Sequence, residues 1–159
     1  MRYLLAAHFI GFVAGLRSLT PPAAVSWGAW LGWLHLQGSP FGFMASGITV
    51  TIFSTLALVE LITDKLPQTP NRTKPGPLMA RMITGGLAGG ALSAAGGNSV
   101  LAGVAVGALG GLVGAFAGYE ARRRLVTEAG MKDGVVALLE DVLAIGLACL
   151  LVWVAGSAA

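Results

Sequence analysis

Six apolar segments separated by short breaks constrain this chain more than any other feature. A helix that crosses the hydrocarbon core of a bilayer needs about 20 mostly apolar residues. Only 11% of the 159 residues are charged, whereas a soluble domain usually has about 25%. We therefore predict an all-α polytopic transmembrane helix bundle, formed by one domain over residues 1–159. The predicted membrane segments are 3–16, 21–36, 41–62, 78–95, 100–121 and 134–154.

Proline and glycine set the breaks between these segments. Pro21 and Pro22 lack a backbone N–H and restrict Thr20, so the first helix must end before them. Glycine-containing turns at 37–40 and 96–98 end two further segments, and the proline-rich loop 67–77 is too polar to enter lipid. The first segment is short. It either spans the membrane, which gives six spans, or is a re-entrant half-helix, which gives five.

The basic residues indicate the orientation of the chain. If all six segments span, nine of the ten lysines and arginines lie on one face and only Arg2 lies opposite. The positive-inside rule makes that face cytoplasmic, including loop 67–77. We therefore expect a multi-pass protein of a bacterial inner membrane. Basic residues confined to connections do not indicate a nucleic-acid partner.

Glycines recur along segment 100–121 at spacings of four and three, so they share one helix face. Small residues let helix backbones approach closely in lipid, where helices have no hydrophobic drive to associate. We predict a glycine zipper that joins the fourth and fifth segments. A glycine-lined pore is the alternative. The glycines are Gly103, Gly107, Gly110, Gly114 and Gly118.

Charged residues in or beside the membrane segments form the candidate site. A charge at membrane depth costs about 3 kcal/mol on insertion scales unless it is paired or faces water. We expect an ion-pair network or a polar cavity on the cytoplasmic side, in which Arg17 pairs with Glu60, Asp64 or Glu140. The full candidate set is Arg17, Glu60, Asp64, Arg81, Glu120, Arg122, Glu140 and Asp141.

An internal repeat is a further prediction. Three helices followed by three helices have opposite orientations, as in inverted-repeat transporters. The half-repeats would be 1–66 and 78–157, joined by loop 67–77. Local support is confined to an Arg-x-x-Thr match between 15–20 and 80–84, which chance explains equally well.

Several motifs resemble domain-of-unknown-function family 4126, a family of small bacterial multi-span inner-membrane proteins. They are GFVAGLRSLTPPA at 11–23, ELITDKLP at 60–67, TPNRT at 69–73, LMAR at 78–81 and LED at 139–141. The similarity covers nearly the whole chain. It implies a multi-span membrane protein and implies no activity.

Three hypotheses for function remain open. The first is a small transporter or channel-like protein for a solute or ion, with a charged cytoplasmic-side cavity. The second is a structural or accessory membrane subunit with architectural ion pairs. The third is a lipid-phosphate-binding protein or enzyme, in which Arg17, Arg72 and Arg81 hold phosphate and the acids hold Mg²⁺. No metal, cofactor or catalytic motif is found, so an enzyme has no motif support. Membrane lipid is the expected partner, and homo-oligomers are compatible with all three hypotheses.

Overall fold

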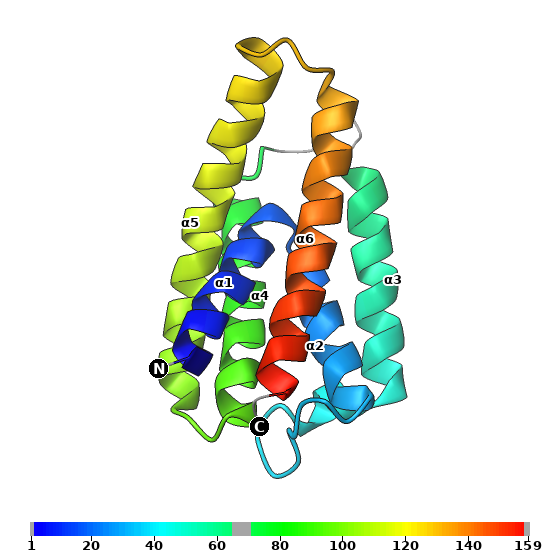
Figure 1. Cartoon of the computed structure of the whole chain (residues 1–159), viewed down its shortest axis with the longest axis vertical. Coiled ribbons are helices and arrows are strands. Elements are labelled where there is room, and N and C mark those ends of the chain that lie inside the picture. Colours follow the sequence, from blue (N-terminus) through cyan, green and yellow to red (C-terminus); the bar gives the residue numbers. More distant parts are fainter. Residues whose placement is uncertain (1, 65–70, 158–159) are drawn as a thin grey trace.

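The helices of the computed structural model run alternately up and down along one long axis (Figure 1). The model describes residues 2–64 and 71–157, and these form helices and no strand. Both termini lie toward the lower end in Figure 1, and the α5–α6 connection forms the upper tip. The elements are α1 (Arg2–Leu16), α2 (Thr20–Trp30), the 3-10 helix η1 (Gly42–Ala45), α3 (Gly47–Thr63), α4 (Pro75–Ala95), α5 (Val100–Thr127) and α6 (Asp133–Gly156).

The first two helices form a broken pair inside the bundle. α1 has 15 residues and α2 has 11, which correspond to about 22 Å and 16 Å at 1.5 Å per residue. Neither reaches the 30 Å or so of a hydrocarbon core. The turn between them, residues 17–19, lies well below the tip of α5 and α6 (Figure 1). Pro21 and Pro22 occupy the first turn of α2, where their missing N–H groups break no helical hydrogen bond.

Glycines bring the backbones of α1, α4 and α5 into contact. Gly107 of α5 lies against the backbones of Gly11 in α1 and Gly85 in α4. A Cβ atom on Gly89 would lie only 2.7 Å from the carbonyl oxygen of Gly103. Side chains larger than hydrogen therefore do not fit at these positions unless the helices separate.

The predicted glycine face of α5 is divided between two neighbours. Gly103 and Gly107 face α4. Gly110 and Gly114 instead face backbone carbonyl groups of α1, which was not predicted. Gly118 lies higher, against side chains of the charged site described below. The glycine stripe thus joins three helices rather than two.

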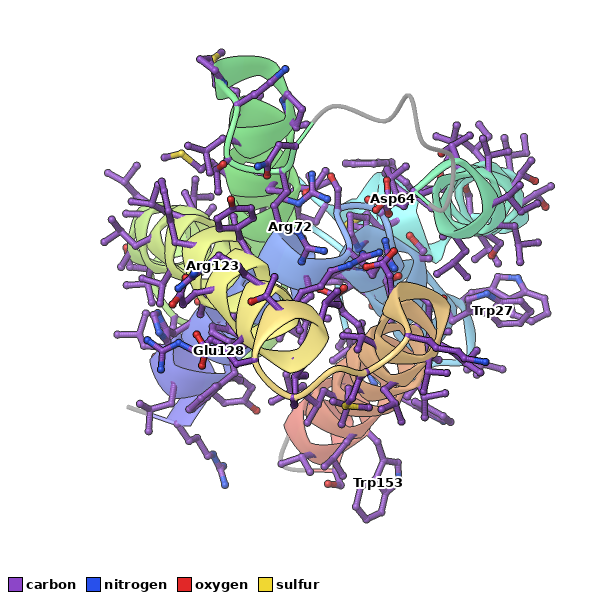
Figure 2. All side chains as sticks on the ribbon, turned by 90° about the horizontal axis from the view of Figure 1, so that it is seen from above. Trp27, Asp64, Arg72, Arg123, Glu128 and Trp153 are labelled. Carbon is purple, nitrogen blue, oxygen red and sulfur yellow. The ribbon has the colours of Figure 1, made fainter. Side chains whose placement is uncertain are left out.

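Many large apolar side chains are exposed on the outside of the molecule, while several charged side chains are buried. α5 and α6 are long and apolar enough to cross a membrane, and only 33% of the most apolar window of each is buried. α1 and α3 are shorter apolar helices. Ile48, Ile62 and Leu101 are 74%, 66% and 78% exposed, whereas the Arg17 side chain is completely buried. Figure 2 shows Trp27 and Trp153 pointing outward from the bundle.

The predicted end of the second segment and the predicted start of the third were wrong, since α3 begins at Gly47 rather than 41. The second segment was predicted to reach residue 36, but α2 ends at Trp30. Gly32 adopts a left-handed φ of 78°, and the N–H groups of Trp33 and Leu34 donate back to the Gly28 carbonyl. The chain then folds back and buries Leu34.

The proline-rich loop is shorter than predicted. α4 already begins at Pro75, and a proline is compatible with the first helical turn. The predicted loop 67–77 therefore loses its last three residues to α4. Residues 65–70 of this region lie outside the part of the chain that the structure describes.

The two halves of the bundle differ in helix length. The first three α-helices have 15, 11 and 17 residues, and the last three have 21, 28 and 24. Close structural repeats would have similar lengths at corresponding positions. The inverted repeat stays a prediction that these lengths do not support.

Candidate buried charge site

Arg17 is the centre of a buried charge network in the upper half of the bundle. It follows α1 and is completely buried. Its Nε donates to Oδ1 of Asp141 in α6 at 2.7 Å, and its Nη1 pairs with Asp64 at the end of α3. Arg81 of α4 approaches the same Asp64 carboxylate at 3.7 Å. One arginine in the α1–α2 turn therefore links α3 and α6.

Glu60 and Arg81 satisfy the backbone groups exposed by the helix break. The two carboxylate oxygens of Glu60 accept the N–H groups of Ser18 and Leu19, at 2.7 and 2.8 Å, just before α2. The Nε of Arg81 donates to the Gly15 carbonyl at the end of α1, at 3.0 Å. An anion at a helix N-terminus and a cation at a C-terminus also match the helix dipoles. The break is thus stabilised by side chains from α3 and α4.

Arg72 and Glu140 form the second centre of the network. Arg72, which precedes α4, makes a bidentate pair with Glu140 of α6, and its Nη2 donates to Oε2 at 2.9 Å. Arg122 of α5 lies beside the same carboxylate, with Nη1 3.7 Å from Oε2. Both members of the Arg72–Glu140 pair are buried. Figure 2 shows Arg72 and Asp64 toward the interior of the ring of helices.

Each arginine of the described network has an acid beside it. Four arginines face four acids, and Arg122 also binds a fifth acid, Asp133. Paired buried charges avoid most of the cost of isolated ones. The members are Arg17, Arg72, Arg81 and Arg122 with Glu60, Asp64, Glu140 and Asp141.

Glu120 does not belong to this network, although it was a predicted member. It pairs on the surface with Arg123 and Arg124. The sequence predicted Glu120 as a member of the network, but its carboxylate is occupied by two arginines of its own helix.

Arg122 lies at the edge of the network and bridges to an acid that was not predicted. Its Nε and Nη2 donate to the two carboxylate oxygens of Asp133, both at 2.8 Å. This hydrogen bonding lowers the pKa of Asp133, the first residue of α6. The pair ties the upper ends of α5 and α6 together.

Sequence reasoning found most of the buried charges and one of the two partners of Arg17. Arg17 pairs with Asp64, one of three predicted partners, and with Asp141, which was not among them. The sequence predicted a binding role for Arg72 only in the phosphate-site hypothesis. Its position in a proline-rich loop otherwise indicated the orientation of the chain in the membrane, not an ion pair. Its pairing with Glu140 depends on the tertiary fold, which brings residue 72 beside α6.

Two grooves open between helices on the outside of the bundle. One, of about 340 Å³, lies between α5, α6 and the end of α1, with Arg122 and Glu140 in its wall. The other, of about 400 Å³, lies between α2 and α3 beside Trp27 and Trp30. Among the described residues, no group of three or more His, Cys, Asp or Glu side chains is arranged to hold a metal ion.

The fold and site define an all-α protein with many exposed apolar side chains, a buried cluster of paired charges and two helices long and apolar enough to cross a membrane. The model of the family described as "Domain of unknown function (DUF4126)" matches residues 4–158, and the chain belongs to this family. Comparison with curated proteins and with solved structures finds no match.

Proposed function

We propose that this chain is a multi-pass protein of a bacterial inner membrane. The supporting observation is the placement of its side chains: arginines and acids are buried while many large apolar side chains are exposed on the outside. Water would destabilise such a surface, whereas lipid solvates it. The upper end carries the basic connections and is the cytoplasmic end by the positive-inside rule.

Within the membrane, we propose that the protein is a small transporter or channel-like protein for a solute or ion. The observation that carries this proposal is the α1–α2 break, held at depth by Glu60 and Arg81. Irregular backbone inside a membrane occurs where it is buried in protein or lines a cavity, and broken helices form the binding sites of many transporters. In this proposal the network is a closed cytoplasmic gate.

The second candidate is a structural or accessory subunit. The pairing within the network favours it, because a substrate site needs groups that exchange partners. Buried ion pairs that only fix helix positions would look the same in a single conformation. The two candidates differ in what happens when a pair is weakened.

Proteoliposomes separate them. Purified Asp64→Asn and wild-type protein are reconstituted, and proton flux driven by a potassium gradient with valinomycin is read with an internal pH dye. If the network is a gate, proton flux across Asp64→Asn vesicles should be at least about tenfold faster than across wild-type vesicles. A change of about 1.4 kcal/mol in the opening equilibrium would have this effect. Arg123→Gln, which alters a surface pair, should stay as tight as wild type.

A folded Asp64→Asn protein that is as tight as wild type would favour the structural candidate. Asp141→Asn provides the second test, because Asp141 binds the same arginine from another helix. If both variants fold and neither leaks, the gate proposal is wrong.

A further inference from the structure

Helix α3 is attached to the rest of the bundle by few contacts. Of its 17 residues, Val50 and Glu60 are buried. It packs on α2 and η1, and no other described helix contacts it extensively. Figure 2 shows α3, which ends beside Asp64, at the margin of the bundle. The position of this helix therefore depends on a small number of interactions, which differ between its two ends.

The lower end of α3 is anchored by apolar packing. The preceding element, η1, packs on α2 and contains Met44, which is completely buried. Val50, near the start of α3, is buried as well. Ser46 caps the helix by accepting the N–H of Thr49. Burial of apolar surface does not depend on ionised groups, so this end stays in place when charges elsewhere change.

The upper end of α3 is held by two carboxylates. Glu60 accepts the two N–H groups that precede α2, at 2.7 and 2.8 Å. Asp64 pairs with Arg17 and lies 3.7 Å from Arg81. No apolar side chain of residues 51–63 is buried. The attachment of this end is therefore largely electrostatic, and it weakens when either acid loses its charge.

The contact between α2 and α3 leaves unfilled space. A groove of about 400 Å³ lies between the two helices. The Nε1 of Trp27 donates to the hydroxyl of Ser54 beside it, at 3.0 Å. By contrast, α1, α4 and α5 meet through glycines with no room for a Cβ atom. Closely packed interfaces resist displacement, so α3 can tilt more readily than these three helices can.

We propose that α3 is a hinged lid over the α1–α2 break, fastened by Glu60 and Asp64. Hinges are often element-terminal residues that absorb backbone changes, and Gly47 is the first residue of α3, with only Nε1 of Trp30 near its missing Cβ, at 3.8 Å. About 25 Å of helix separates Gly47 from Asp64. A tilt of about 15° would therefore move Asp64 by roughly 6 Å and uncover Arg17. The inference rests on the proposed gate, for which it names the moving helix.

Distances between spin labels test the lid. Cys149 is first replaced by serine. Labels are then attached in pairs to exposed positions of α3 and α6, and the protein is measured in lipid nanodiscs by double electron–electron resonance. The labelled pairs are Ile62 with Leu138 toward the upper end and Ile48 with Leu150 toward the lower end. With Asp64→Asn, the upper pair should gain a component longer by roughly 5 Å, as the lever length predicts. The lower pair should stay unchanged.

Arg123→Gln, which removes an exposed ion pair, is the control and should keep both wild-type distances. Unchanged upper distances in a folded Asp64→Asn protein would overturn the lid, and so would equal shifts of both pairs. If Asp64→Asn does not fold, Glu60→Gln removes the charge of the other carboxylate and is judged by the same outcomes. The proton-flux assay is read separately. A leak without displacement of α3 would end the lid and keep the gate, whereas displacement without a leak would keep the lid and end the gate.

Discussion

Arg17 shows how one residue can determine the arrangement of several helices. Its side chain is completely buried and bound to carboxylates of α3 and α6. A guanidinium suits this position because its planar fork donates in several directions at once. The sequence shows that a charge follows a 14-residue apolar run and must find a partner. It does not show whether the partner comes from α3 or α6, because that depends on helix packing.

We expect Arg17→Ala to lower the free energy of unfolding by about 3–5 kcal/mol, because it leaves buried carboxylates without their cation. Reversible unfolding in mixed detergent micelles measures the change. Arg123→Ala, which removes an exposed arginine beside Glu120, is the control and should have no measurable effect. A loss in Arg17→Ala no larger than in the control would show that the network does not stabilise the fold.

A double-mutant cycle tests the partner of Arg17. The combined loss in Arg17→Ala/Asp141→Ala should be smaller than the sum of the single losses, by about 1–3 kcal/mol, since the two residues share one interaction. The same cycle with Asp133→Ala should be additive, because Asp133 binds Arg122 instead. Additivity for the Asp141 pair would contradict a direct interaction.

At the scale of the elements, the break between α1 and α2 depends on Glu60 as much as on proline. The prolines predict that the first helix ends near residue 20. They do not predict that a carboxylate from α3 accepts the two freed N–H groups. α2 also ends at Trp30 rather than 36, because Gly32 reverses the chain while the sequence stays apolar. Apolar runs therefore located the helices well, but hydropathy alone missed a turn inside such a run.

Glu60→Gln should destabilise the protein by about 1–3 kcal/mol, because an amide can accept only one of the two N–H groups and leaves the other unsatisfied. Thermal unfolding in detergent measures this loss. Glu128→Gln, at an exposed position after α5, controls for loss of a negative charge. Equal stability of Glu60→Gln and wild type would mean that the helix break does not need this carboxylate.

The glycine stripe of α5 gives a second prediction for the elements. Leucine at Gly110 or Gly114 would meet the carbonyl groups of His8 or Phe12 and push α1 away from α5. We expect a loss of about 3 kcal/mol, the upper end for overpacked contacts. Gly146→Leu on α6 has open space and should be neutral or slightly stabilising. Similar stabilities for all three variants would exclude the glycine contact between α1 and α5.

At the scale of the whole molecule, the distribution of charged and apolar side chains supports the proposed membrane placement. Paired charges occupy the interior of the upper half, and apolar side chains face outward along α3, α5 and α6. In the proposed membrane placement, the alternating helix directions make α1 and α2 together enter and leave at the lower end, whether each is counted as a span or as half of a re-entrant pair. Both termini then lie at the end opposite the buried arginines.

This geometry predicts the result of labelling at single cysteines. Cys149, the one native cysteine, is exposed on α6 and is first replaced by serine. Cysteine is then placed at Thr73 or Glu128 in the upper connections, or at Gln37 in the lower one. An impermeant maleimide added to intact spheroplasts should label only the Gln37 variant, and inside-out vesicles should show the reverse. The positive-inside rule places the basic connections in the cytoplasm. Labelling of the Thr73 and Glu128 variants from the periplasm would therefore contradict the proposed orientation. Labelling of all three variants from one side would instead exclude the alternating bundle as the membrane-inserted form.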